Sequence, residues 1–235
     1  MKTIILAGGM GKRLREVIKA VPKPMAPVGG RPFLEFLILQ LLKYSIKDIV
    51  LSIGYKAESV RSYFGNGKRW GADIIYSEEN EPLGTGGAIR KASELIKDDE
   101  FIAMNGDSFL DMDFNRLISC HREKEAFATI GLAYVDNTGR YGRVETGEKG
   151  EITGFTEKGF NGPGYINGGV YLFSRKVMHN VPEGNVSLEE DVFPLLLGHG
   201  LYGMEVKGFF KDIGIPEDYR SLCNDKDIFA RLAGA

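Results

Sequence analysis

The sequence has few of the residues that build metal centres, disulfide frameworks or membrane spans. Its 235 residues include two cysteines, Cys120 and Cys223, which lie far apart and have no paired spacing. We therefore expect ordinary thiols and neither a zinc site nor a disulfide framework. No apolar run reaches the roughly 18 residues of a membrane span, and Gly8 interrupts the first apolar run before signal-peptide length. These absences predict a cytoplasmic protein with no membrane association.

An excess of one charge is also missing. Thirty Lys and Arg stand against 32 Asp and Glu, for a formal net charge of −2. Such a chain has no overall basic field to attract nucleic acid, so we expect no nucleic-acid partner. Histidine is scarce, and the three histidines fall in no motif. Glycine, by contrast, is abundant, with 31 residues that cluster in a way typical of functional loops.

The first half of the chain alternates apolar runs of strand length with segments of helical period. Strands are predicted at 2–7, 48–53, 73–76 and 101–104, and helices at 32–44, 57–64, 87–96 and 113–124. This order predicts a mostly parallel sheet with helices on both faces.

The second half contains further strand-like runs separated by turn residues. They lie at 126–135, 142–146, 151–156 and 169–173, and helices are expected at about 187–197 and 217–231. Some of these strands are expected to pair antiparallel beside the main sheet. Because no linker or repeat interrupts the chain, we expect one domain over residues 1–235, with halves at about 1–112 and 113–235.

A glycine loop follows the first predicted strand. "LAGGMGKRL", residues 6–14, combines a strand, permissive backbone and two adjacent cations, an arrangement that points backbone N–H groups at an anion. It is not a Walker loop, because Arg13 follows Lys12 where Ser or Thr is required. A tight turn with solvated charges is the alternative.

A second cation lies on stiff backbone. In "VPKPMAPV", residues 21–28, Lys23 stands between two prolines, which restrict its backbone. With Arg13 it predicts a preorganised cation pair, and a proline-rich surface connector is the alternative.

Two later motifs suggest a binding site for a nucleotide base and a binding site for a metal ion. In "NEPLGTGGAI", residues 80–89, the glycines predict a groove without side chains that suits a flat ring, or else a helix cap. In "MNGDSF", Asp107 follows a strand, where ligands of open α/β sheets bind. Asp212 of "FFKDIGIPEDY" is a second carboxylate, and Mg²⁺ with phosphates takes one or two of these. Either aspartate alone also fits a turn or cap.

The motif "FTEKG" pairs Glu157 with Lys158. Such a pair suits a hydroxyl-bearing, phosphorylated ligand, because the carboxylate accepts from hydroxyls and the ammonium binds phosphate. A solvated edge is the alternative.

Together, and in this order, these motifs resemble those of the sugar-1-phosphate nucleotidyltransferases from about residue 2 to residue 220. The matching segments are Gly8 to Leu14, Pro22 to Met25, Leu83 to Gly87, Asn105 to Asp107, Glu157-Lys158, Asn167 to Gly169 and Asp212. The resemblance implies a three-layer α/β/α sandwich with a Rossmann-like, mixed and mostly parallel sheet of the nucleotide-diphospho-sugar transferase type. Residues 1–112 would bind nucleotide and residues 113–235 sugar phosphate.

Longer stretches, such as "PKPMAPVGGRPFLEF" and "YINGGVYL", resemble the bacterial D-glycero-α-D-manno-heptose 1-phosphate guanylyltransferases. This resemblance implies GTP and heptose 1-phosphate as substrates, Mg²⁺ as cofactor, and GDP-heptose for surface glycans such as lipopolysaccharide, capsule or S-layer as product. The chain departs from the wider family at Lys12, usually Thr, and at 15–18, usually Pro-Leu-Thr. Lys12 leaves the hydroxyl contact of the loop in doubt.

Other members of the class fit the same motifs. Guanylyl or uridylyl transfer to mannose, glucose or N-acetylmuramate 1-phosphate is one alternative, and a non-catalytic regulatory subunit that binds nucleotide sugar is another. The family resemblance also allows a homo-oligomer.

The resemblance implies a role for each motif residue. Arg13 and Lys23 would be catalytic, and Asp107 and Asp212 would hold the metal. Nucleotide binding is expected at Leu6, Ala7, Gly8, Gly9, Gly11, Glu81, Gly84, Thr85 and Gly86. Sugar-phosphate binding is expected at Asn105, Gly106, Gly142, Glu157, Lys158, Asn167 and Gly168.

Guanine carries N1–H and N2–H₂ donors that one carboxylate can accept together. Glu81, just before the glycine-rich base loop, is the predicted acceptor, with recognition by backbone groups alone as the alternative.

Overall fold

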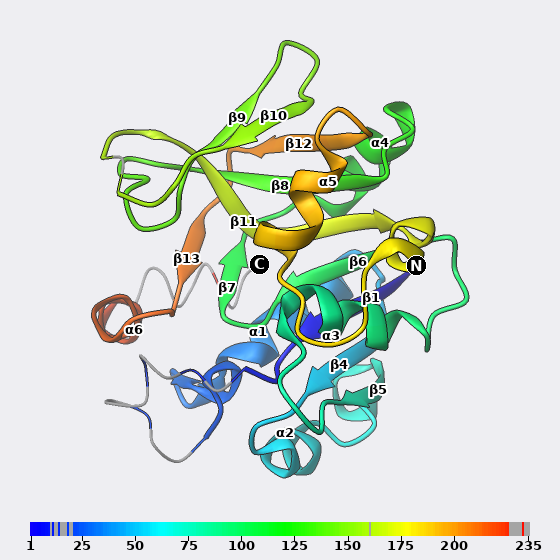
Figure 1. Cartoon of the computed structure of the whole chain (residues 1–235). Helices are drawn as coiled ribbons and strands as arrows, with labels where there is room; N and C mark the ends of the chain where they lie inside the picture. The colour runs from blue at the N-terminus through cyan, green and yellow to red at the C-terminus, as the bar shows by residue number, and fades with distance from the viewer. Residues whose placement is uncertain are drawn as a thin grey trace.

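The central sheet consists, within the part of the chain that the structure describes, of seven strands in the order β12-β8-β11-β6-β1-β4-β5 (Figure 1). The computed structural model describes residues 1–9, 11, 14, 18, 21–159, 161–225 and 232. The seven strands are β1 (Lys2–Leu6), β4 (Asp48–Ile53), β5 (Asp73–Glu78), β6 (Glu100–Asn105), β8 (Ala128–Val135), β11 (Gly164–Ser174) and β12 (Leu201–Val206).

The sheet is mixed and mostly parallel. Strands β5, β4, β1 and β6 pair parallel to one another, and β12 pairs parallel to β8. Strand β11 lies antiparallel to both β6 and β8 and joins these two groups. The sheet therefore continues without a break through both halves of the chain, and the predicted fold class is confirmed.

Helices cover both faces because the strands are apolar on both sides. In β1, Ile4 and Ile5 are fully buried in different hydrophobic clusters, as expected for a central parallel strand. One face packs against α1 (Phe33–Lys43), α2 (Ala57–Phe64), α4 (Phe114–Glu123) and α6 (Pro216–Asn224). The other packs against α3 (Gly84–Ser93), η4 (Arg175–Asn180), η5 (Leu188–Val192) and α5 (Phe193–Leu196).

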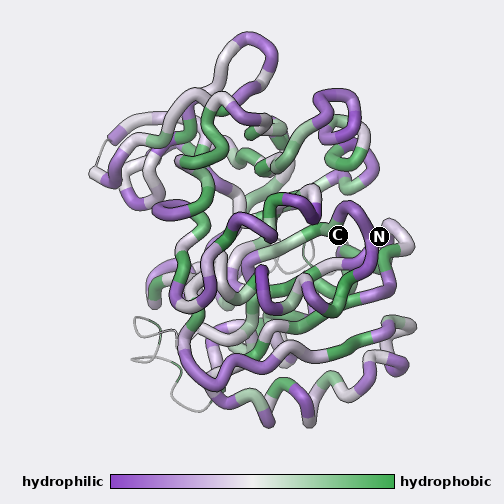
Figure 2. The backbone as a smooth tube through the Cα atoms, turned by 45° about the vertical axis from the view of Figure 1, so that its right-hand side comes forward, coloured by the Kyte–Doolittle hydropathy of each residue, from purple (hydrophilic) through white to green (hydrophobic). Residues whose placement is uncertain are grey.

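This arrangement gives the three predicted layers. Figure 2 shows hydrophobic residues concentrated along the inner strands and hydrophilic residues at the outer turns. Among the described residues, none of the helices has both the length and the apolar character needed to cross a bilayer.

The predicted elements of the first half are confirmed, with shifts of a few residues at their ends. Helix α3 begins at Gly84 rather than residue 87. In the second half, β11 begins at Gly164 rather than residue 169. The helix expected at 187–197 is divided into η5, a π-helical turn, and the short α5. The helix expected at 217–231 is described as far as Asn224, and its last predicted residues, 226–231, lie outside the described residues.

Several short strands were not predicted. The unpredicted strands are β2 (Pro27–Val28), β3 (Arg31–Pro32), β7 (Ser108–Leu110), β12 and β13 (Phe210–Asp212). Strands β9 (Val144–Thr146) and β10 (Ile152–Phe155) form an antiparallel pair outside the main sheet, as expected. The pairing of β7 with β13 has the greatest consequence for function, because it joins two motifs that lie far apart in the sequence.

A buried histidine predicts how stability responds to acid. His121 of α4 is 2% exposed and its Nδ1 lies 2.8 Å from Thr129 Oγ1, and burial lowers its pKa below the ordinary value of 6.5. The unfolded chain therefore takes up this proton first as pH falls, which favours unfolding. From about pH 7.5 to about pH 5.5 the free energy of unfolding should fall more in wild type than in His121→Gln, measured by urea denaturation.

The exposed His199→Gln variant is the control for this measurement and should keep the wild-type pH response. An equal loss of stability in wild type and His121→Gln would contradict the prediction.

Candidate active site

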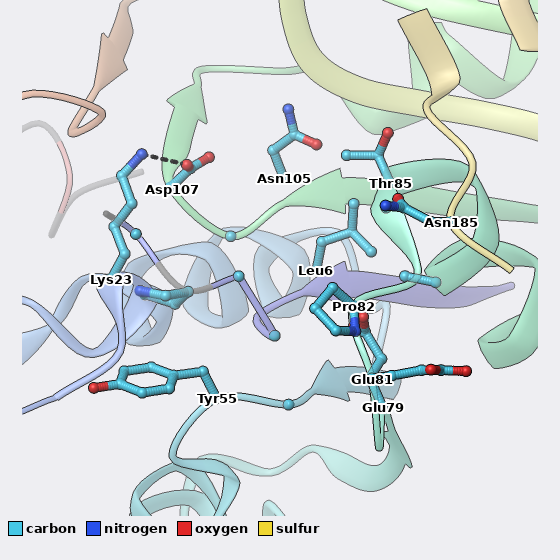
Figure 3. Close-up of a pocket in the computed structure, with 18 of the residues that line it drawn as sticks. Leu6, Lys23, Tyr55, Glu79, Glu81, Pro82, Thr85, Asn105, Asp107 and Asn185 are labelled. Atoms are coloured by element: carbon cyan, nitrogen blue, oxygen red, sulfur yellow. Dashed lines mark hydrogen bonds and ion pairs between the residues drawn. The ribbon is translucent and has the colours of Figure 1, made fainter. Parts of the chain in front are cut away.

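A cavity of about 630 Å³ opens where β1 and β6 end. Most of the predicted nucleotide-binding residues, together with Lys23, Asp107 and part of the predicted sugar-phosphate set, line it. The predicted residues that line the cavity are Leu6, Gly8, Gly9, Gly11, Lys23, Glu81, Gly84, Thr85, Asn105, Gly106 and Asp107. Figure 3 shows Lys23 and Asp107 at one end of this cavity and Thr85, Glu81 and Asn185 toward the other.

Close backbone packing explains the glycines at the ends of β1 and β6. The Gly106 N–H donates to Leu6 O at 3.0 Å, and a Cβ at this position would collide with the same carbonyl. Gly8 O accepts from the Tyr55 N–H at 3.2 Å, and a Cβ on Gly8 would lie 2.5 Å from Glu79 Oε1. These residues must be small for the two loops to line one cavity.

Lys23 and Asp107 form an ion pair at the charged end of the cavity (Figure 3). Lys23 begins the short helix η2 (Lys23–Met25), whose Pro24 is buried. The Lys23 side chain is only 14% exposed. Lys23 therefore lies between Pro22 and Pro24 with its side chain directed to Asp107, and the rigidity expected of this backbone stays a prediction.

The β7–β13 pair brings Asp212 beside Asp107. Asp212 stands opposite Ser108 in the register, and the Ile213 N–H donates to Asp107 O at 3.0 Å. Burial, and then repulsion from Asp107, raise the pKa of Asp212, while Lys23, the Gly214 N–H and Arg140 act in the opposite direction. The two predicted metal carboxylates are thus close enough to sense each other's charge.

The sequence analysis missed Arg140. Its Nη2 lies 3.5 Å from Asp212 Oδ2, and its Nη1 donates to Asp218 Oδ2 at 2.6 Å. Burial, and then the charge of Asp212, raise the pKa of the neighbouring Tyr141 to about 12. No motif marked this arginine, because its partners lie more than one element away in the sequence.

The glycines of the base loop have a different role from the predicted one. A Cβ on Gly84 or Gly87 would collide with the backbone of residues 184–186, and the Gly86 N–H donates to Val186 O at 2.8 Å. The expected open groove along glycines 84, 86 and 87 is therefore wrong, because a second segment of the chain fills that side. Gly84 and Thr85 still line the cavity, whereas Gly86 is buried.

A second carboxylate lies at this end of the cavity. Glu79 is half-buried; its Oε1 accepts from Ser52 Oγ at 3.1 Å and its Oε2 from the Leu83 N–H at 3.2 Å. Glu81 is exposed at the same loop. Glu79 was not singled out from the sequence, and its position directly after β5 was the signal that could have marked it.

The remaining predicted residues lie outside the cavity lining. Ala7 is buried and its N–H donates to Ser52 O at 2.7 Å. Asn167 Nδ2 donates to the Tyr171 hydroxyl at 3.0 Å, and Asn105 Nδ2 lies 3.5 Å from the same oxygen. Asn105 and Asn167 are therefore brought together through a buried tyrosine, with Gly168 next in the chain.

The other sugar-phosphate residues gather on loops beside β9 and β10. Glu157 and Lys158 are exposed, and the following Gly159 N–H donates to Gly139 O at 2.7 Å. Gly142 has a positive φ of 79°, and a Cβ there would lie 2.6 Å from Thr156 O. Arg13 and Lys12 lie outside the described residues.

The carboxylates fit a hard divalent cation. Asp107 and Asp212 would supply oxygen ligands; Lys23 forms an ion pair with Asp107, and Arg140 with Asp212. Asn105 Oδ1 and Ser108 Oγ, which lie close to Asp107 in the chain, are buried and have no hydrogen-bond partner among the described residues. Within the described residues no group of three or more His, Cys, Asp or Glu could hold a metal, so Mg²⁺ would take its other ligands from water and phosphates, as is usual for this ion.

Comparison with known proteins agrees with this geometry. The family model described as "Nucleotidyl transferase" matches residues 2–227. The chain belongs to the nucleotidyl transferase family. The matched residues include those that line the cavity.

Several relatives of this nucleotidyltransferase match it along almost their whole length. The D-glycero-alpha-D-manno-heptose 1-phosphate guanylyltransferase of Aneurinibacillus thermoaerophilus is 40% identical over 94% of this chain and 96% of the relative. The protein of the same name from Campylobacter jejuni is 38% identical over 93% and 97%. The crystal structure of HddC from Yersinia pseudotuberculosis complexed with GMP-PN superposes with a TM-score of 0.84 at 35% identity, covering 94% and 97% of the two chains.

The contact between α3 and residues 184–186 predicts that one Gly→Ala substitution in this helix lowers the free energy of unfolding instead of raising it. Gly→Ala inside a helix ordinarily stabilises by up to about 1 kcal/mol. At Gly87 the new Cβ meets Gly184 O, so Gly87→Ala should lower the free energy of unfolding by about 1–3 kcal/mol in urea denaturation. Gly9→Ala, whose Cβ meets no described atom within 4 Å, should change it by less than about 0.5 kcal/mol. A stabilised Gly87→Ala would refute this packing.

Proposed function

We propose that this nucleotidyltransferase transfers GMP from GTP to D-glycero-α-D-manno-heptose 1-phosphate and releases pyrophosphate. The relatives that bear this activity in their names match nearly the full chain in both directions. The observation that carries the proposal is the β7–β13 pairing, which brings Asp212 beside Asp107. Asp107 lines the cavity together with Lys23, and the segment at 79–85 contributes to the same lining. Such an enzyme would work in the cytosol, where GTP is available.

The proposed reaction needs no general base. A sugar phosphate oxygen, already an anion, forms a bond to the α-phosphorus of GTP while the bond to the β-phosphate oxygen breaks and pyrophosphate leaves. Catalysis then depends on in-line positioning and on neutralising charge. In the proposal Lys23 neutralises the α-phosphoryl group, Arg13 the pyrophosphate and Lys158 the incoming sugar phosphate.

The other predicted residues bind and orient the two substrates. Backbone N–H groups of the loop at 8–11 would cradle the nucleotide phosphates, and Glu157, Asn167 and the Gly142 loop would bind the sugar. Asp107 and Asp212 would hold Mg²⁺, whose charge would stabilise the phosphate oxygens.

A second candidate is transfer to another sugar 1-phosphate. The mannose-1-phosphate guanylyltransferase of Mycobacterium tuberculosis is 36% identical over 92% of this chain, but the match spans only 62% of that relative. The nearly complete two-way coverage of the heptose-specific proteins favours heptose.

A panel of GTP, ATP, UTP and CTP against heptose, mannose, glucose and N-acetylmuramate 1-phosphates, read as pyrophosphate release, tests the proposal. GTP with heptose 1-phosphate should give the highest kcat/KM. A higher value for another pair would replace this assignment, and no release with any pair would favour a regulatory subunit.

The carboxylate pair predicts a large effect on turnover. Asp107→Asn and Asp212→Asn should each lower pyrophosphate release with Mg²⁺ by about 10³-fold or more, because charge stabilisation at the phosphates is lost. Circular dichroism should show a folded protein in both variants. Near-normal turnover in either one would discard its assignment to the metal.

The base-recognition residue is tested by a pair of amide variants. Glu81 is the carboxylate predicted from the sequence, and Glu79 is the second candidate because it is more buried. A buried carboxylate that finds no donor on the wrong base cannot bind water instead, so it discriminates more strongly between bases than an exposed one. We expect Glu79→Gln to lower the preference for GTP over UTP at least about tenfold and Glu81→Gln to lower it less. The reverse order would assign the base to Glu81, and no change in either variant would leave recognition to backbone groups.

A further inference from the structure

Each carboxylate of the Asp107–Asp212 pair faces a cation from the chain itself. Lys23 pairs with Asp107, and Arg140 lies 3.5 Å from Asp212 through its Nη2. Two neighbouring carboxylates repel each other in a partly buried site, and these cations offset that repulsion. The structure thus shows the pair with positive charge on both sides.

The two cations differ in how freely they can leave. The Lys23 side chain is 14% exposed and lies on the proline-flanked helix η2. The Arg140 side chain is 44% exposed and lies on a loop between β8 and β9. Arg140 can therefore move away from its carboxylate without disturbing the core.

Arg140 also has a better partner than Asp212. Its Nη1 donates to Asp218 Oδ2 at 2.6 Å, and its guanidinium carbon lies 5.0 Å from the centre of the Tyr141 ring. These contacts tether the arginine to the first turn of α6, so the longer contact with Asp212 is the one it can give up. An ion pair held at 3.5 Å with exposure to water contributes little to stability on its own.

We propose that Arg140 is a removable counter-ion for Asp212, which neutralises this carboxylate until a divalent cation binds and then retains only Asp218. The inference rests on the proposed function, because it takes Asp107 and Asp212 as the metal carboxylates. It makes Arg140 a positioning residue that competes with the metal and so weakens binding of the metal alone. A metal that arrives together with nucleotide phosphates overcomes this competition.

The competition can be measured without turnover, by the binding of Mn²⁺ alone, followed through the electron paramagnetic resonance signal of the free ion. Arg140→Gln removes the competing charge and should bind Mn²⁺ about tenfold more tightly than wild type. Arg143→Gln removes the same charge from the same loop, where the side chain donates to Pro163 O, and should bind Mn²⁺ as wild type does. Binding by Arg140→Gln that is unchanged or weaker would overturn the proposal and leave Arg140 a structural brace.

Two further variants test the tether independently of how well Arg140→Gln folds. Asp218→Asn releases Arg140 from its stronger partner and should weaken Mn²⁺ binding severalfold, because the arginine then pairs more fully with Asp212. Arg140→Lys keeps the charge without the forked geometry and should tighten binding less than Arg140→Gln. Unchanged or tighter binding in Asp218→Asn would count against the proposal.

Asp212→Asn separates this inference from the proposed function. If Asp212→Asn loses Mn²⁺ binding while Arg140→Gln shows no tightening, the counter-ion role alone fails. If Asp212→Asn binds Mn²⁺ as wild type does, the metal assignment in the proposed function fails, and the counter-ion role fails with it.

Discussion

The active site depends on a ribbon of two three-residue strands, β7 and β13. Its backbone pairing, continued by the Ile213 N–H to Asp107 O bond, places two carboxylates from distant parts of the chain beside each other. The two carboxylates carry like charges, so their contact with each other opposes this arrangement. The backbone hydrogen bonds, together with Lys23 and Arg140, offset that repulsion and make a compact anionic centre possible.

The same sheet separates this charged centre from the loop that would face the base. Strands β1 and β6 end at the cavity and carry the glycine loop and Asp107, whereas β5 ends at Glu78 and leads into the loop at 79–85. Because these strands run parallel, their carboxyl ends open on one edge. The antiparallel strand β11 joins these strands to those of the second half, so one sheet connects the two halves.

Local pattern was sufficient for the sheet strands and α-helices of the first half, because long apolar runs and helical periodicity identify buried strands and amphipathic helices. It was insufficient for β7 and β13, which are three residues long and pair with each other although they lie about a hundred residues apart in the chain. A local pattern carries no information about such a distant partner. Strand β12 contains Gly203, which weakens a strand pattern. The motif residues of the cavity were found because their spacing is local, whereas Arg140 and Glu79 matter through partners that only the fold brings near.

The glycines of α3 also have a consequence for changing what this enzyme accepts. Gly84 and Gly87 abut the backbone at 184–186, and Val186 exchanges hydrogen bonds with Leu83 and Gly86. The conformation of the segment at 83–87 is therefore set in part by residues 184–186, from the second half of the chain. A directed-evolution library aimed at a new nucleotide should vary both segments together, because a larger side chain in one segment requires the backbone of the other to move away.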